Sequence, residues 1–138
     1  MMQIHGGCVS LNGAGVLIRG PSGAGKSDLA LRLIDQGGRL VSDDRTDLFA
    51  SEGHLFAAPP EKLAGLMEIR GVGLVDIPHI PWAAIRLVID LVPADQVDRL
   101  PEPAFETLCG IEVRKFDLWA FEPSAPAKIH AIMALQTR

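Results

Sequence analysis

The residues best suited to chemistry form one glycine-rich segment, Gly20-Pro21-Ser22-Gly23-Ala24-Gly25-Lys26-Ser27. The segment matches the pattern G-x-x-x-x-G-K-[ST] in full, which is typical of a phosphate-binding loop. Glycines let consecutive backbone N–H groups approach phosphate oxygens that a Cβ atom would keep away. Lys26 would face the terminal phosphates, and the Ser27 hydroxyl would ligate Mg²⁺. The segment therefore predicts binding of a nucleoside triphosphate together with Mg²⁺.

The sequence on both sides of this segment fits such a loop. An apolar run, Val16-Leu17-Ile18, precedes it and predicts a strand. From Lys26 onward the apolar residues recur at helical spacing, which predicts an amphipathic helix of roughly three turns. Gly37-Gly38 would end this helix. A helix that starts at the loop directs its N-terminal dipole at a bound anion, so the context favours a phosphate site over an ordinary glycine-rich turn.

A pair of carboxylates, Asp43-Asp44, follows a short predicted strand over residues 39–42. Ligands of open α/β sheets lie at the carboxyl ends of strands. Neighbouring side chains of an extended segment point in opposite directions. One carboxylate could therefore face Mg²⁺ and its waters while the other accepts a proton from an incoming hydroxyl as general base. The alternative is an aspartate pair in a turn or helix cap, and the upstream phosphate loop favours the functional interpretation.

Three further residues are weaker candidates. Glu68 lies beside Gly71 and Gly73, where an ion pair next to a turn is the commoner interpretation. His5 stands at the start of a predicted strand, and a lone histidine there is usually structural. Arg99 has the local appearance of a solvated charge. The local sequence alone does not assign any of these three residues to a site.

Strands outnumber helices in the remaining sequence. Asn12-Gly13 predicts a hairpin between residues 3–10 and 15–19. A mixed sheet with few helices follows, in an α/β fold that is not an alternating βαβ series. The other predicted elements are a hairpin of 46–50 and 54–58, a helical turn within 61–66, a buried strand at 85–91, a last strand at 117–121 and a last helix at 127–136.

Composition limits the classes of protein that this chain can belong to. The 138 residues predict one domain over 1–138, and 48% hydrophobic with 22% charged residues predict a globular fold. A net charge of −4 and the lack of a Lys/Arg cluster argue against nucleic-acid binding. The apolar runs are too short to span a membrane. With no visible signal peptide and two cysteines about a hundred positions apart, we expect a cytoplasmic protein with reduced thiols.

Taken together, these segments resemble the catalytic domain of HPr kinase/phosphorylase, the bacterial enzyme that acts on a serine of the phosphocarrier HPr. The resemblance covers most of residues 4 to 100 and preserves the order of the family's motifs. The matching pieces are His5-Gly6, Gly20 to Ser27 with the following helix, Arg39 to Arg45, Glu68-Ile69-Arg70-Gly71-Val72-Gly73-Leu74-Val75-Asp76 and Asp98-Arg99-Leu100.

The resemblance implies a P-loop nucleotide-binding fold of the phosphoenolpyruvate-carboxykinase-like type. It also implies ATP and Mg²⁺ as cofactors, an HPr-like phosphocarrier as partner, and a homo-oligomer, which is a hexamer in full-length members. The implied roles are β/γ-phosphate binding by Lys26, Mg²⁺ ligation by Ser27 and Glu68, proton transfer with the substrate serine by Asp44, and completion of the site by His5 and Arg99.

Two departures from the family pattern shape the expected activity. The phosphate loop begins at residue 20, so we expect a short form without the N-terminal domain of the long form. The family's late loop carries two arginines that serve dephosphorylation, whereas residues 121–126 here read Phe-Glu-Pro-Ser-Ala-Pro. We therefore expect a serine kinase with weak reverse phosphorylase activity. Two alternatives stay open: a P-loop small-molecule kinase, and a nucleotide-sensing regulator without turnover.

Overall fold

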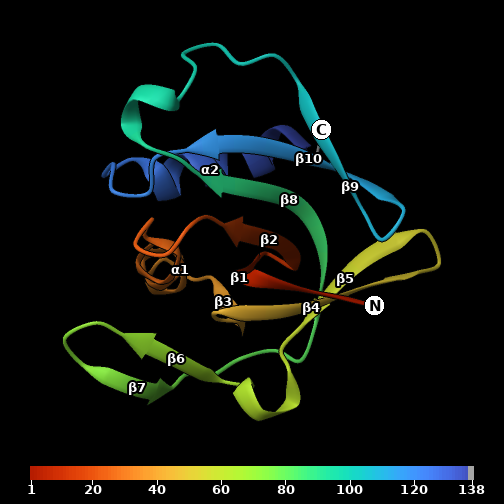
Figure 1. Ribbon diagram of the computed structural model, residues 1–138, viewed down its shortest axis with the longest axis vertical. Helices are drawn as coiled ribbons and strands as arrows, with labels where there is room; N and C mark the ends of the chain where they lie inside the picture. The colour runs from red at the N-terminus through yellow and green to blue at the C-terminus, as the bar shows by residue number, and fades with distance from the viewer. Residues whose placement is uncertain (137–138) are drawn as a thin grey trace.

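The computed structural model of the protein describes residues 1–136 (Figure 1). The strands are β1 (Met2–Leu11), β2 (Ala14–Arg19), β3 (Arg39–Ser42), β4 (Arg45–Ser51), β5 (His54–Ala58), β6 (Leu66–Ile69), β7 (Gly73–Asp76), β8 (Ala83–Leu91), β9 (Ala104–Leu108) and β10 (Ile111–Leu118). The α-helices are α1 (Lys26–Asp35) and α2 (Ala125–Gln136), and the short 3₁₀ helices are η1 (Glu61–Leu63) and η2 (Ala94–Gln96).

The main sheet has eight strands and closes on itself in part. Strands β2, β1, β4, β5 and β8 pair in that order, and β8 pairs in turn with β2. Strand β3 pairs with β1, while β10 and β9 extend the sheet from β8. The β2–β8 and β8–β10 pairs are parallel and the others are antiparallel. The predicted α/β fold with a mixed sheet is thus confirmed.

Both predicted hairpins form, and their turns explain their sequences. Asn12 and Gly13 adopt φ values of 52° and 84° between the paired residues Leu11 and Ala14. Glu52 and Gly53 adopt 50° and 80° in the β4–β5 turn. Positive φ at both central residues is the geometry of a type I′ turn, whose twist matches that of the flanking strands.

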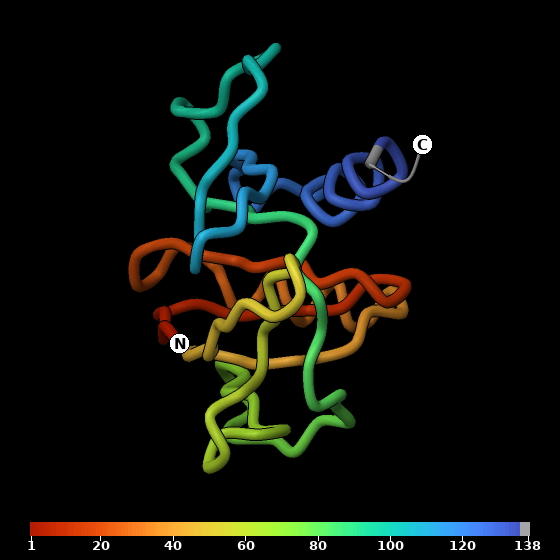
Figure 2. Tube along the Cα trace, turned by 90° about the vertical axis from the view of Figure 1, so that its right-hand side faces the viewer, coloured from red at the N-terminus to blue at the C-terminus, as the bar shows by residue number. Residues whose placement is uncertain are grey.

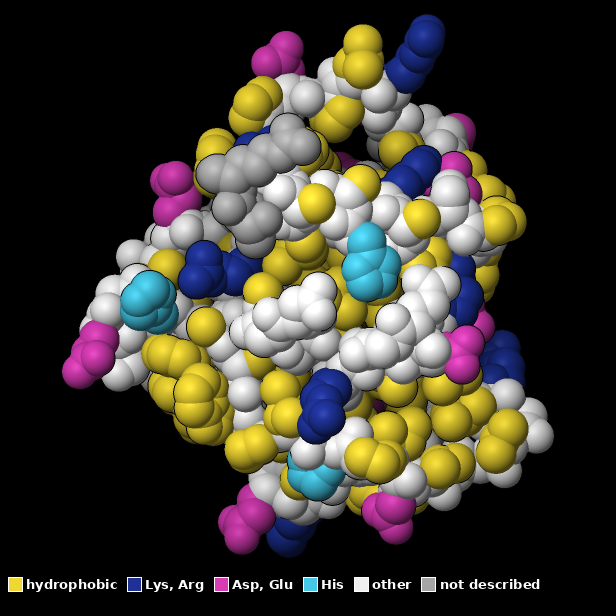
Figure 3. Space-filling view, turned by 180° about the vertical axis from the view of Figure 1, so that it is seen from behind, with side chains coloured by type: hydrophobic (Ala, Val, Ile, Leu, Met, Phe, Trp, Pro, Cys, Tyr) yellow, Lys and Arg dark blue, Asp and Glu magenta, His cyan; other side chains and the backbone are white. Residues whose placement is uncertain are grey.

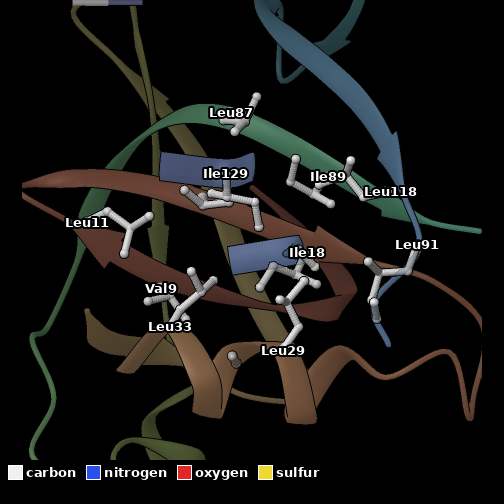
Figure 4. Packing of buried hydrophobic residues seen from close by; sticks show 14 of the residues in the cluster. Val9, Leu11, Ile18, Leu29, Leu33, Leu87, Ile89, Leu91, Leu118 and Ile129 are labelled. Atoms are coloured by element: carbon white, nitrogen blue, oxygen red, sulfur yellow. The ribbon is translucent and has the colours of Figure 1, made fainter. Parts of the chain in front are cut away.

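The core has two layers, one on each face of the sheet. Successive residues of β1 alternate between them, since Val9 belongs to the layer under the helices and Cys8 to the other layer. Leu29 and Leu33 of α1 and Ile129 of α2 pack on the first layer (Figure 4). Because both faces of the sheet are covered, most residues of the central strands are apolar, with little alternation between apolar and polar side chains.

The helical predictions hold with small shifts. Helix α1 begins at Lys26, and the Gly38 N–H donates to the Leu33 carbonyl at 2.9 Å to close its C-terminal end. Helix α2 begins at Ala125, two residues before the predicted start. Among residues 1–136, neither helix is long and apolar enough to cross a membrane.

The predicted strand at 117–121 was misplaced, and β9 was not predicted. Strand β10 ends at Leu118, and residues 119–124 form turns. The β9–β10 hairpin carries many charged residues, and two of them pair with charges on other strands of the sheet. Glu106 pairs with Arg19 of β2, and Lys115 pairs with Asp90 of β8 at 3.2 Å. A charged pattern of this kind hides the apolar alternation from which strands are predicted.

The exterior seen from behind mixes residue types (Figure 3). Lysine and arginine side chains are scattered on this face among apolar and acidic ones. The small hairpin β6–β7 lies at one end of the molecule, and the segment 92–103 rises at the other end in both ribbon and tube views (Figures 1 and 2).

Candidate functional site

A cavity of about 940 Å³ brings the predicted phosphate loop together with residues from four other segments. The loop joins β2 to α1, and the hairpin β6–β7 contributes residues 68–74 to the lining. The side chains that matter for chemistry are His5, Lys26, Ser27, Asp44, Glu68 and Phe121.

The loop backbone depends on two glycines. Gly23 and Gly25 have φ values of 84° and 97°, which residues with a Cβ atom rarely adopt. A Cβ atom on Gly25 would also lie 2.8 Å from the Ala120 Cβ atom, so this position has no room for a side chain. The Leu29 N–H then donates to the Gly25 carbonyl at 2.9 Å, which starts α1 directly at the loop.

Lys26 holds its charge at the loop itself. Its Nζ atom donates to the carbonyl of Gly20 at 2.6 Å and to that of Pro21 at 3.1 Å. The ammonium group is therefore positioned before any ligand arrives. An anionic phosphate can replace these neutral carbonyls as its acceptor, because charge-assisted hydrogen bonds are the stronger ones.

Asp43 connects the phosphate loop to the end of β3. The Ser27 hydroxyl donates to Asp43 Oδ1 at 2.9 Å, and the Glu68 backbone N–H donates to Asp43 Oδ2 at 3.3 Å. The side chain is buried, and this burial raises the pKa of the carboxyl group, although the Ser27 hydrogen bond acts in the opposite direction. A buried carboxylate held against the loop hydroxyl is suited to bind a cation.

These oxygens fit Mg²⁺. The ion prefers oxygen ligands, keeps several waters, and is usually held by one or two carboxylates together with substrate phosphates. Among the described residues, no group of three or more His, Cys, Asp and Glu could hold a metal ion unaided. Ser27 and Glu68, which line the cavity, and Asp43, which accepts the Ser27 hydrogen bond, would therefore share Mg²⁺ with a nucleotide. Asp43 thus joins the predicted pair of Ser27 and Glu68.

Asp44 points away from Asp43 and towards His5. The His5 Nε2 atom lies 3.0 Å from Asp44 Oδ1, and both side chains are more than 60% exposed. The Arg45 N–H donates to the Asp43 carbonyl at 2.7 Å across Asp44, whose φ is 66°. The two carboxylates diverge as predicted, but a tight three-residue turn separates them rather than an extended strand. Such strained turns are frequent at functional sites.

Two glycines explain how His5 reaches Asp44. A Cβ atom on Gly6 would lie 2.6 Å from the Ile18 carbonyl oxygen, and one on Gly7 would lie 3.2 Å from that of Ser42. Strand β1 can therefore lie close to the ends of β2 and β3. This packing places the exposed His5 in the lining of the cavity.

Arg99 is the one predicted site residue that the structure keeps away from the others. It is exposed in the segment after η2, and it does not line the cavity of its own chain. Figure 1 shows this segment at the end of the molecule that lies opposite the β6–β7 hairpin. The predicted role of Arg99 stays a prediction.

Phe121 is a cavity residue that the sequence did not reveal. It falls in the misplaced last strand, and its ring packs against Gly25, which lies 96 positions earlier in the chain. An isolated aromatic residue in a turn carries no local signal of a binding site. Only the approach of the 119–124 segment to the phosphate loop gives it that place.

The geometry agrees with comparisons to known proteins. The profile of a family described as "HPr Serine kinase C-terminal domain" matches residues 1–135. The chain belongs to this family. The HPr(Ser) kinase/phosphatase of Coxiella burnetii has the same fold, with a TM-score of 0.88 and 28% identity over 99% of this chain and 97% of that one.

Members of the HPr serine kinase family among curated proteins are longer. An HPr kinase/phosphorylase of Leptothrix cholodnii is 42% identical over 124 residues, which are 80% of this chain and 38% of the relative. One from Streptococcus thermophilus is 53% identical over 76 residues, which are 54% of this chain and 25% of the relative. The chain thus spans well under half the length of these curated relatives.

Proposed function

We propose that this protein is an ATP- and Mg²⁺-dependent kinase that phosphorylates a serine of an HPr-like phosphocarrier. The observation that carries the proposal is the single cavity in which Asp44 and His5 face the same space as Lys26 and Ser27. Membership of the HPr serine kinase family and the names of the relatives support the choice of substrate.

The phosphate loop would bind and orient the nucleotide. Its N–H groups and the N-terminus of α1 would hold the phosphates, and Lys26 would neutralise charge on the terminal ones. When bound, Mg²⁺ would supply positive charge that offsets the charge of the phosphates. Ser27 and Asp43, linked by their hydrogen bond, would keep the ion-binding oxygens in place. Phosphoryl transfer depends mostly on such positioning and charge neutralisation.

Asp44 would act as the general base. The serine oxygen of the partner forms a bond to the γ-phosphorus, the bond from that phosphorus to ADP breaks, and the serine proton passes to the Asp44 carboxylate. Its neighbour His5 would orient the carboxylate through the 3.0 Å contact. Because both side chains are exposed, a serine on another protein can reach them.

We further propose, from the family resemblance, a homo-oligomer and a role for Arg99 in the reaction. Since Arg99 does not line the cavity of its own chain, it would act on the bound partner protein or in the cavity of another copy. Arg99→Ala, with the molecular mass in solution measured in parallel, tests this role. A variant with unchanged turnover would remove Arg99 from the site.

The direct test uses purified protein, γ-labelled ATP, Mg²⁺ and an HPr protein with its target serine. We expect label on that serine, no label on an HPr with the serine replaced by alanine, and none with Lys26→Ala. Binding of Mg–ATP without transfer to HPr would contradict the kinase proposal and favour a nucleotide-sensing role.

A further inference from the structure

Phe121 places an exposed aromatic ring in the wall of the cavity. The side chain is 52% exposed, and it lines the same space as Gly25 and Lys26. Most of the other lining side chains are polar or small. The apolar side chains that also line the cavity are Leu31, Ile69, Val72 and Leu74. Among the described residues, however, Phe121 is its one aromatic ring other than His5, and it offers a surface for a flat, partly apolar group of a ligand.

One arginine fixes the backbone on both sides of this ring. Arg32 of α1 donates to the Ala120 carbonyl through Nη2 and to the Glu122 carbonyl at 3.3 Å through Nη1. Its Nε atom also donates to Asp28 at 3.0 Å, which holds the guanidinium on the helix surface. The ring is therefore held in place before a ligand binds, which lowers the entropic cost of using it.

The neighbouring aromatic ring adds to this support. The Trp119 ring meets the Phe121 ring edge to face, with centroids 6.5 Å apart and an interplanar angle of 75°. A Cβ atom on Gly25 would lie 3.0 Å from Phe121 Cζ, so the ring edge rests on the phosphate loop. Phe121 is thus a fixed part of the loop's surroundings.

In-line phosphoryl transfer limits where the nucleoside can lie. The attacking and leaving oxygens lie roughly in line across the transferred phosphorus, so the nucleoside must extend away from Asp44. The first two turns of α1 supply Asp28 and Leu31 to the cavity, and Phe121 lies over the start of the helix. A nucleoside that extends from the loop along the start of α1 would meet the Phe121 ring.

We infer that Phe121 is the surface on which the base of the bound nucleotide stacks. This inference rests on the proposed nucleotide binding. It adds a contact of the protein with the base, which is the group that an inorganic polyphosphate lacks. Every base has a flat π-face, so stacking of this kind tolerates different bases. Arg32 and Trp119 are positioning residues for the ring.

The test compares Mg–ATP with Mg–tripolyphosphate, which carries the phosphates without a base. Calorimetry measures both affinities for the unsubstituted protein, Phe121→Leu and Phe121→Tyr. Leucine keeps apolar packing over Gly25 and loses the aromatic face, whereas tyrosine keeps both. We expect Phe121→Leu to bind Mg–ATP about tenfold more weakly and tripolyphosphate normally, because only ATP carries a base that can stack on the aromatic side chain. Phe121→Tyr should bind both ligands normally.

A spectroscopic readout uses the position of Trp119. The chain has two tryptophans, and Trp82 packs elsewhere, edge to face with Phe56. In a Trp82→Phe background, ATP should change the Trp119 emission, and tripolyphosphate should change it much less. Equal spectral changes with the two ligands would contradict stacking at this place.

The outcomes separate the two proposals. If Phe121→Leu lost affinity for Mg–ATP and Mg–tripolyphosphate equally, at an unchanged melting temperature, Phe121 would only shape the phosphate loop. That result would overturn the inference. Unchanged ATP affinity would overturn it as well. Failure of the unsubstituted protein to bind either ligand would instead contradict nucleotide binding itself, and with it the stacking role.

Discussion

The Ser27 hydroxyl donates a 2.9 Å hydrogen bond to the Asp43 carboxylate and so ties the start of α1 to the end of β3. The same carboxylate receives the Glu68 N–H at 3.3 Å. Three segments that are distant in the chain therefore meet at one buried acid. Because this acid is next to Asp44 in the chain, the expected ion site and the expected base are positioned by a single turn.

Lys26 should be essential for binding and transfer. Lys26→Ala removes the ammonium group held at the loop mouth, and hydrogen bonds to charged groups contribute about 1.5–3 kcal/mol, so Mg–ATP should bind roughly 10- to 100-fold more weakly. Calorimetry and the transfer assay measure the effect. Lys62→Ala, at an exposed position of η1, is the matched control. Normal affinity and turnover in Lys26→Ala would refute the phosphate-loop assignment.

Asp44 and Asp43 should separate catalysis from binding. Asp44→Asn keeps the shape and removes the base, so we expect near-normal Mg–ATP affinity and a transfer rate lower by about 10²-fold or more. Asp35→Asn, exposed at the end of α1, is the control. If affinity in Asp44→Asn fell as far as the rate, Asp44 would be an ion ligand instead of the base.

Asp43 should make the stability of the metal-free protein depend on pH. Burial raises its pKa in the folded state above the ordinary value of 3.8, so the folded protein binds this proton more tightly than the unfolded chain. The resulting stability is complete below the unfolded pKa and is lost as pH rises through the folded pKa.

The measurement for Asp43 compares melting temperatures with those of Asp43→Asn, which cannot titrate, in the presence of a chelator. The melting temperature of the unsubstituted protein minus that of the variant should fall as pH rises from about 4 towards neutrality. A constant difference across this range would show that burial does not shift the Asp43 pKa.

The forward reaction should dominate over phosphorolysis. Phosphorolysis must bring inorganic phosphate next to a phosphoserine, which requires added positive charge near the site. Lys128, the first cation after the 121–126 segment, pairs with Glu122 at 2.7 Å and lowers the pKa of that carboxyl group. Neither residue lines the cavity.

Release of label from phosphorylated HPr, with saturating phosphate and Mg²⁺, measures the reverse rate. We expect weak or undetectable release relative to the forward rate. Comparable rates in both directions would mean that another cation, such as Arg99 from a neighbouring copy, supplies the missing charge.

The two cysteines should differ in reactivity. Burial raises the pKa of the Cys8 thiol to about 12, so it stays protonated and covered at neutral pH, whereas Cys109 is partly exposed. An alkylating reagent should modify one thiol in the native protein and two in denaturant, as counted by mass spectrometry. Rapid modification of both native thiols would contradict the burial of Cys8.

Features encoded within a short stretch could be predicted from the sequence. The glycine-rich loop between β2 and α1, the start of α1 and the two hairpin turns each depend on glycine or asparagine at fixed neighbouring positions, and the positions of all four were predicted correctly. The pairing of charged residues across β9 and β10 was invisible, because it depends on Arg19 and Asp90 from other strands. Local patterns report local backbone preferences, and they report packing only where one face is uniformly apolar.

The composition of the site shows the same division. The types and spacing of Lys26, Ser27, Asp43 and Asp44 were sufficient to predict phosphate and ion chemistry. His5 and Asp44, which are in contact, are 39 positions apart in the sequence, and Phe121 and Gly25 are 96 positions apart. Contacts of this range exist because β1 packs closely on the ends of β2 and β3, and because Arg32 holds the 119–124 segment against α1. Tertiary packing brings such residues together, and no pattern of neighbouring residues encodes it.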